Sequence, residues 1–274
     1  MPTDDMEPAL EAIQFFANSA NSVLVFGALT DGVTTSSTLA DRTGASRSTI
    51  ARILDEGESR GWVESEGSRY ELTYMGELMI EEFRTHLETI EGAQQLGSVI
   101  NDLPEPAREL DIRPLRDAKI TTPSSEWPGA HYNRALELYR TGDTYRGLTQ
   151  VAPEMIVQTL AEQVEQGELE LEGVIGAAFT EELVDDPERA APWHAFADRV
   201  WVYDGNIPVN MHLIDERVVL WLDRAGGDRA CGQGLLESEH PAVVSWAESL
   251  YGEYKSEAEP LDPTRLPEVQ SGRS

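Results

Sequence analysis

Cysteine and lysine are nearly absent from this chain, and each absence narrows the class of protein. Cys231 is the single cysteine, which excludes an internal disulfide and a cysteine cluster for zinc. We expect Cys231 to be a small buried residue, with redox sensing through an intermolecular bridge as the alternative. Lys119 and Lys255 are the only lysines, which leaves 19 arginines among the 21 basic residues.

Basic residues of either kind are few beside the acidic ones. Asp and Glu number 50 against 21 Lys and Arg, and the formal net charge is -29. A carboxylate-rich surface with almost no lysine is typical of proteins that work in molar salt. We therefore expect a halophilic protein.

Long hydrophobic runs and catalytic motifs are also missing. No apolar run approaches the roughly 18 residues that a membrane-spanning helix needs, and MPTDDMEP has no basic and hydrophobic leader. The sequence contains no GxxxxGK, HExxH, GxSxG or CxxC motif, and no His-x-Lys of the phospholipase-D type. Its five histidines lack metal-ligand spacing. We expect a cytoplasmic protein that is not an enzyme, with no membrane partner, cofactor or metal.

Residues 35–61 have the pattern of two short helices joined by a tight turn. Gly44 permits the turn, and Ser46 is placed to cap the second helix. Ile50, Ile53 and Leu54 give that helix one buried face. Hydroxyls and arginines on and beside the other face suit contacts to phosphates and base edges. The predicted DNA-binding residues are Ser36, Ser46, Arg47, Ser48, Thr49, Arg52, Arg60 and Arg69.

A strand pair is predicted directly after these helices, over 62–65 and 68–73 about Glu66-Gly67. The whole stretch, TSSTLADRTGASRSTIARILDEGESRGWVESEGSRYELTYMGE, resembles the winged helix-turn-helix of archaeal transcription regulators of the ArsR and MarR-like groups. The resemblance implies a double-stranded-DNA-binding domain over residues 1–75, with the strand pair as the wing. In molar salt the Debye length is only about 3 Å, so the repulsion between this acidic chain and DNA is mostly screened.

Residues 76–97 read as a long helix in which Ile80, Phe83, Leu87 and Ile90 recur at spacings of three, four and three. Two interpretations stay open, because this seam fits either packing on the protein's own body or a homodimer interface. We assign residues 76–101 to a linker or dimerisation helix. Pro104 and Pro106 then mark a domain boundary.

Residues 102–258 alternate between helices and strands, which predicts a mixed α/β domain and makes the whole chain α+β. Helices are expected at 130–140, 153–166 and 241–255, and strands at 169–176, 199–203, 209–214 and 217–223, the last two joined at Asp215-Glu216. Residues 259–274 form a polar, proline-bearing tail that we expect to be loosely ordered.

The features of this second half resemble the C-terminal domain of the FilR1-like methanogenesis regulatory proteins. They are Leu115-Arg116-Asp117-Ala118 leading to Thr121-Thr122-Pro123, the hairpin NMHLIDERVVLWLD, and W-x-x-x-L-Y-x-x-Y-x-x-x-A over 246–258. The resemblance implies a sensing or assembly role and names no ligand.

A small-molecule effector with a carboxylate or phosphate is predicted to bind where aromatic, imidazole and guanidinium groups meet the start of a helix. The predicted effector-binding residues are Trp127, His131, Tyr132, Arg134, Tyr145 and Arg146. The alternative is that these arginines pair with local acids such as Glu137 and Asp143.

Taken together, the sequence predicts a homodimeric, effector-responsive, sequence-specific transcription regulator. The second hypothesis is a winged-helix protein-interaction module of the transcription machinery.

Overall fold

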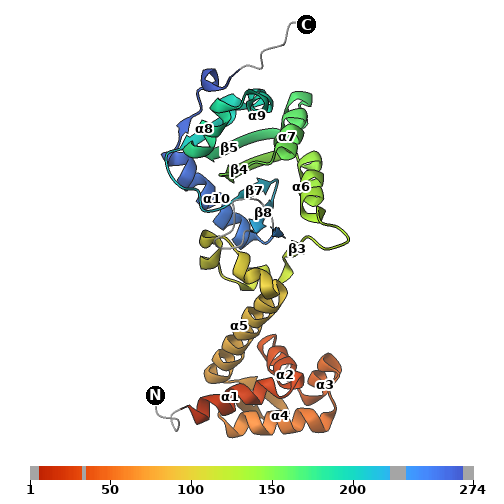
Figure 1. Cartoon of the computed structure of the whole chain (residues 1–274). Coiled ribbons are helices and arrows are strands. Elements are labelled where there is room, and N and C mark those ends of the chain that lie inside the picture. Colours follow the sequence, from red (N-terminus) through yellow and green to blue (C-terminus); the bar gives the residue numbers. More distant parts are fainter. Residues whose placement is uncertain (1–5, 33–34, 223–232, 268–274) are drawn as a thin grey trace, which may run out of the picture. The chain divides into compact units, whose positions relative to one another are not determined.

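The computed structural model describes residues 6–32, 35–222 and 233–267 (Figure 1). The chain divides into two compact units, Met1–Ile90 (unit 1) and Glu91–Ser274 (unit 2). Cys231 lies outside the described residues, so its predicted burial is not addressed. In the part of the chain that is described, no single helix is long and apolar enough to cross a membrane. Only α1 and α2 together reach that length and composition, with an 88° bend between them.

Unit 1 consists of helices around an aromatic core, with one strand pair. Its elements are α1 (Glu7–Ala17), α2 (Ala20–Thr30), α3 (Ser36–Thr43), α4 (Arg47–Ser59), β1 (Val63–Glu66), β2 (Arg69–Leu72) and the greater part of α5 (Tyr74–Leu96). In the core, the Phe16 and Trp62 rings stack with centroids 5.7 Å apart, and Phe15 meets Phe26 edge-on at 5.3 Å. The two short helices and the antiparallel strand pair lie where the sequence predicts them.

Two glycines show why the chain turns and packs as it does here. Gly44 ends α3 with φ +71°, a left-handed conformation that costs glycine little. Gly76 lies so close to the hairpin that a Cβ on it would be 2.0 Å from the carbonyl oxygen of Trp62. α5 can therefore begin directly against the strand pair.

The seam predicted on α5 belongs largely to the core of unit 1. Ile80 is 2% exposed and Phe83 is 8% exposed, and both pack with Phe16, Trp62 and their neighbours. Leu87 packs partly against the same core, while Ile90 is 39% exposed. The interpretation of Ile80 and Phe83 as an intermolecular seam is therefore wrong, because their apolar surface is already buried within the chain.

Unit 2 is built on an eight-stranded sheet with the order β10-β6-β5-β4-β7-β8-β9-β3 among the described residues. The strands β4, β5 and β6 are parallel to one another, and the other neighbours are antiparallel. Their bounds are β3 Lys119–Thr121, β4 Thr144–Thr149, β5 Glu170–Gly176, β6 Val200–Tyr203, β7 Met211–Ile214, β8 Arg217–Leu222, β9 Gly234–Ser238 and β10 Glu259–Pro260.

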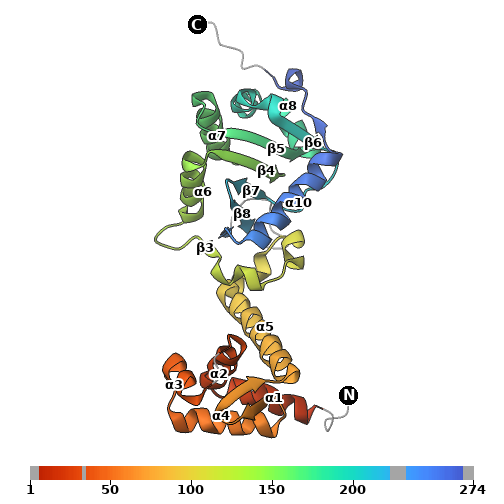
Figure 2. The ribbon, with the colours of Figure 1, turned by 180° about the vertical axis from the view of Figure 1, so that it is seen from behind.

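Helices cover both faces of this sheet (Figures 1 and 2), and each face has its own hydrophobic core. One face is covered by α6 (Ala130–Thr141), α7 (Glu154–Gln166) and α8 (Ala177–Asp185), with the short α9 (Pro187–Ala190) and the turns η5 (Ala191–Ala195) and η6 (Ala197–Arg199). The other is covered by α10 (Pro241–Glu257) and the turns η2 (Gly97–Asp102), η3 (Glu105–Glu109) and η4 (Arg113–Asp117). Alternate residues of a strand therefore enter different cores.

The predicted helices and strands of unit 2 are confirmed to within about two residues, including the hairpin at Asp215. The tail prediction is wrong for the residues that are described. Leu261 and Leu266 are each 4% exposed in the core under α7 and α8, and the amide of Leu261 donates to the carbonyl of Val200 at 2.8 Å. The turn η7 (Pro263–Arg265) lies between these two leucines. Burial of the two leucine side chains stabilises this segment on the core, although most of the residues around them are polar.

Candidate nucleic-acid interface

The start of α4 carries the hydroxyl cluster that the sequence predicts. The Oγ of Ser46 accepts from the backbone N–H of Thr49 at 3.2 Å and so caps the helix. The side-chain oxygens of Ser48 and Thr49 each lie 2.9 Å from the same Oγ. Arg47 and Ser48 are exposed in this first turn. The 13-residue α4 thus presents hydroxyls, a guanidinium and its own N–H groups at one exposed end.

The predicted arginines differ in how freely they can reach a ligand. Arg47 and Arg69 are exposed and have no ion pair among residues 6–32, 35–222 and 233–267. Arg52 is 63% exposed and lies 3.7 Å from Glu56, four residues along the helix. A loose, exposed pair of this kind is worth little, so Arg52 remains able to turn outward.

Arg60 does not belong to this surface, and its assignment to DNA contacts is corrected. Its guanidinium lies over the rings of Trp62 and Phe15, at 5.2 and 5.4 Å from their centroids, and donates to Glu56 at 2.9 Å. The side chain is only 26% exposed, and its Nε is buried without a hydrogen-bond partner. Arg60 therefore packs on the aromatic core and stabilises the position of the end of α4.

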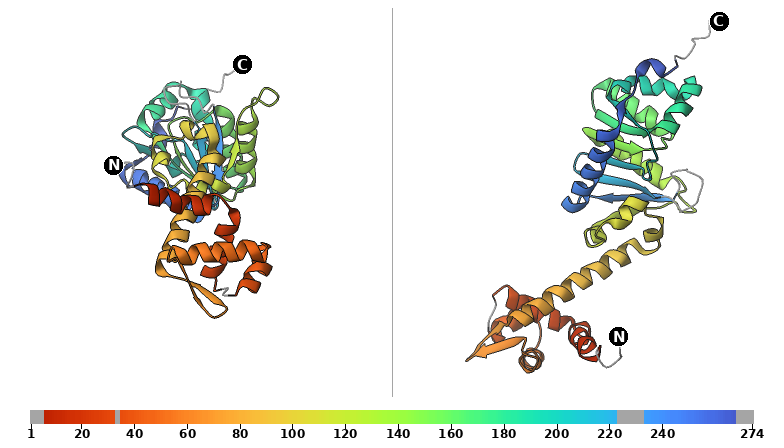
Figure 3. Two further views of the ribbon diagram at one scale, coloured as in Figure 1. Left: turned by 90° about the horizontal axis from the view of Figure 1, so that it is seen from below. Right: turned by 90° about the vertical axis from the view of Figure 1, so that its left-hand side faces the viewer.

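The hairpin that follows α4 projects from the helices of unit 1 (Figure 3). Its strands pair from Val63 with Leu72 to Glu66 with Arg69, and Arg69 also forms a bridge with Thr35 just before α3. Ser36 is half-buried at the first position of α3. Glu64, Glu66 and Glu71 are exposed on the same hairpin. The surface is thus mixed in sign, with Arg69 as the one cation of the two strands.

The predicted effector site is not assembled, first because Arg134 is already occupied. Its guanidinium donates to both carboxylate oxygens of Glu237 at 2.8 Å and to Glu137 at 2.9 Å. The Glu237 side chain is 3% exposed, and its hydrogen bonds raise the pKa of Arg134. The predicted alternative of a local pair with Glu137 is confirmed. The stronger partner, Glu237, lies 103 residues away in the chain, and no pattern in the sequence predicted this pair.

Arg146 lies on the other face of the sheet, because consecutive residues of a strand point in opposite directions. It donates to Glu248 of α10 at 2.9 Å, whereas Tyr145 is buried in the core under α6 and α7. His131 is 2% exposed and Trp127 is 66% exposed. Tyr132 packs against Trp221, with ring centroids 5.5 Å apart. The sheet therefore divides the six residues, and the prediction that they share one anion site is wrong.

Metal binding finds no support in the described part of the chain, where no group of three or more His, Cys, Asp or Glu side chains could hold an ion.

Comparisons with known proteins match both halves of the chain. Residues 10–95 match the family model of the HVO_A0261 N-terminal domain, and residues 128–257 match that of the methanogenesis regulatory protein FilR1, middle domain. The second match confirms the predicted likeness to FilR1 but corrects the domain, because it is the middle domain of FilR1 that matches and not a C-terminal one. The ArsR and MarR-like resemblance stays a prediction. No curated protein matches.

Solved structures show only weak likeness. TrmBL2, an archaeal chromatin protein whose structure shows a novel mode of DNA binding, is 12% identical at a TM-score of 0.40, over 92% of this chain and 99% of its own. Nuc from Salmonella typhimurium, a phospholipase D family member, is 11% identical at a TM-score of 0.40, and the match covers 52% of this chain and 97% of Nuc. NucT from Helicobacter pylori is 10% identical at a TM-score of 0.40, and the match covers 53% of this chain and 99% of NucT. By its family models, the chain joins a segment similar to the HVO_A0261 N-terminal domain to a segment similar to the FilR1 middle domain.

Proposed function

We propose that this protein is a sequence-specific DNA-binding transcription regulator, with a winged helix-turn-helix in unit 1. The observation that carries the proposal is the start of α4, where Arg47 and Ser48 are exposed beside the capped helix terminus. A recognition helix contacts base edges with its N-terminal residues, and phosphates favour a helix N-terminus. The regulatory role named for FilR1 agrees with this assignment.

The charge of residues 31–75, which contain the proposed contact elements, determines how such binding would work. Over residues 31–75 there are five arginines and eight acids, a net of 5 - 8 = -3, against -26 for the other 229 residues. Few phosphates can be neutralised by so few cations, so binding must depend on a small number of directed contacts. One bidentate arginine contact to a guanine is worth about 1 to 3 kcal/mol of discrimination.

Selection of a binding site from random DNA at molar salt, followed by mobility-shift titration, tests the proposal. We expect Arg47→Ala to weaken binding to the selected site by about 5- to 150-fold, the range that 1 to 3 kcal/mol corresponds to. Arg199→Ala is the matched control, because Arg199 is an exposed arginine of unit 2. If no sequence is enriched, or if Arg47→Ala binds like the control, α4 does not read DNA.

A homodimer and adaptation to high salt are further parts of the proposal. Ile90 is 39% exposed at the end of the α5 seam and remains available to a second copy. Light scattering of Ile90→Glu tests this, with Leu24→Glu as control because Leu24 is 50% exposed on α2. A dimer that persists in Ile90→Glu removes this residue from the interface.

A protein-interaction module is the second candidate, and one surface favours it. An apolar groove of about 300 Å³ lies between α1 and α5, lined by Ala12, Ile13, Phe16, Met79 and Phe83. Leu10 and Ile13 are about half exposed beside it, and exposed apolar patches mark contact surfaces. DNA binding that disappears in Arg47→Ala but persists in Ile13→Glu would reject this candidate as the main role of unit 1.

A further inference from the structure

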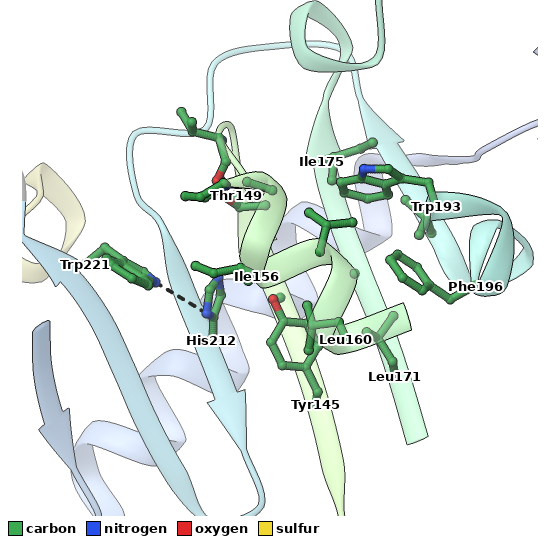
Figure 4. Close-up of a pocket in the computed structure, with 17 residues that line it drawn as sticks. Tyr145, Thr149, Ile156, Leu160, Leu171, Ile175, Trp193, Phe196, His212 and Trp221 are labelled. Atoms are coloured by element: carbon green, nitrogen blue, oxygen red, sulfur yellow. Dashed lines mark hydrogen bonds between the residues drawn. The ribbon is translucent and has the colours of Figure 1, made fainter. Parts of the chain in front are cut away.

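A cavity of about 30 Å³ lies between α7 and the sheet of unit 2 (Figure 4). Side chains of Ile156 and Leu160 from α7 and of Leu171 and Ile175 from β5 form apolar walls, and Trp193 closes one side. A single water needs about 10 to 15 Å³ of such space, so the cavity has room for two or three atoms of that size. Of the six residues predicted for the effector site, Tyr145 lines this cavity, whereas Arg134 and Arg146 do not.

The cavity exists because two adjacent strands place glycines side by side. Gly147 of β4 is the register partner of Gly173 of β5 and of His212 of β7. A Cβ on Gly147 would lie 2.5 Å from the hydroxyl of Tyr145, so packing explains that glycine. A Cβ on Gly173 would meet a single atom within 4 Å, the carbonyl oxygen of Gly147 at 3.6 Å. Packing therefore leaves the glycine at 173 unexplained, and strand glycines often mark the close approach of a ligand.

His212 supplies the polar group of the cavity, and its hydrogen bonds determine which nitrogen carries the proton. The indole Nε1 of Trp221 can only donate, and it donates to His212 Nδ1 at 3.4 Å. Nδ1 therefore carries no hydrogen, and the hydroxyl of Tyr139, 2.6 Å away, donates to it as well. Burial lowers the pKa of His212 to about 3, so the ring is neutral near pH 7.

The single proton of the neutral ring must then be on Nε2. No acceptor for this N–H is found among the residues that the structure describes. His212 lines the cavity, so an acceptor brought by a ligand could receive this N–H there. The tautomer therefore selects ligands that accept a hydrogen bond.

We propose that this cavity binds a small, uncharged, mainly apolar molecule whose one hydrogen-bond acceptor receives the Nε2–H of His212. The apolar walls exclude charged ligands, because an unpaired charge there would be costly to desolvate. The small volume limits the ligand to a few heavy atoms unless α7 shifts. Such binding would make unit 2 the sensing part of the regulator, and this consequence rests on the proposed function.

Nuclear magnetic resonance of the full chain with ¹⁵N-labelled histidine tests the site directly. Dimethyl ether, with three heavy atoms, is the probe with an acceptor, and propane is the control of equal heavy-atom number without one. We expect dimethyl ether to shift the His212 Nε2 signal saturably, and propane to bind without moving it. The absence of a saturable response to dimethyl ether, or an equal Nε2 shift with propane, overturns the proposal.

Gly173→Ala supplies the matched variant, because its methyl group projects into the open space without a clash. We expect a folded protein of higher melting temperature that has lost the response to dimethyl ether. Gly252→Ala of α10, where a Cβ meets nothing within 4 Å, is the control and should keep the response. A wild-type response in Gly173→Ala would place binding elsewhere. These measurements need no DNA, so their outcome is independent of whether unit 1 binds an operator.

Discussion

The ion pair between Arg134 and Glu237 should dominate the electrostatic stability of unit 2, and its two halves should respond unequally to substitution. Glu237 is 3% exposed and Arg134 is 26% exposed. Arg134→Met keeps the aliphatic stem but leaves the buried carboxylate, within the described part of the chain, with Arg217 as its one ion-pair partner, 3.8 Å away. Removing one partner of a buried pair costs about 3 to 5 kcal/mol.

The reverse substitution should cost less. Glu237→Gln leaves Arg134 with Glu137 and with partial access to water, so we expect only the loss of hydrogen bonds to a charged group, about 1.5 to 3 kcal/mol. The double variant Arg134→Met with Glu237→Leu should recover most of the loss, because replacing a whole buried pair by apolar groups is often neutral.

Urea unfolding at molar salt, followed by far-ultraviolet circular dichroism, measures these free energies. Glu182→Ala is the control, because Glu182 is 58% exposed in its pair with Arg189 and should matter by less than about 1 kcal/mol. Arg134→Met and Glu182→Ala of equal stability, or a double variant whose loss equals the sum of the single losses, would refute the reasoning.

Two further outcomes are expected. Leu266→Ala should lower the free energy of unfolding by about 2 to 5 kcal/mol, because Leu266 is 4% exposed; an unchanged urea midpoint would contradict its burial. The pKa of His212 is lowered from 6.5 to about 3 on folding, so the unfolded state binds the proton first and stability should fall as pH decreases from about 6.5 toward about 3. Midpoints measured along that range in wild type and His212→Gln check this, since the variant should lose part of the slope.

Local patterns in the sequence predicted α3, α4, the strand pair and α5 of unit 1 and part of the helices and strands of unit 2, whereas β3, β4, β9 and α8 were not predicted. The cap at Ser46, the turn at Gly44 and the apolar spacing of α4 depend on residues within one or two helical turns of each other. The β7–β8 hairpin at Asp215 likewise depends on alternation within a dozen residues. These features are readable because each residue's neighbours in space are also its neighbours in sequence.

The side-chain roles that the sequence predicted wrongly depend on contacts between distant residues. Arg60 is a residue type that often contacts DNA. Its packing role follows from the positions of Phe15 and Trp62, whose rings lie under its guanidinium. Ile80 and Phe83 have coiled-coil spacing, and only the core of unit 1 decides what covers them. An apolar stripe on a helix predicts that the stripe is buried, but it does not specify which surface packs against it.

The sequence by itself determined the charge balance, the helices and strands with clear local patterns, the capped start of α4 and the likeness of the second half to FilR1. The tertiary structure alone decided that Arg134 and Arg146 lie on opposite faces of the sheet, and that Gly147 and Gly173 meet to leave a cavity beside His212. The physical reason is strand register, because a displacement by one residue exchanges the two faces of a sheet and no short-range pattern fixes the pairing of strands so far apart in the chain.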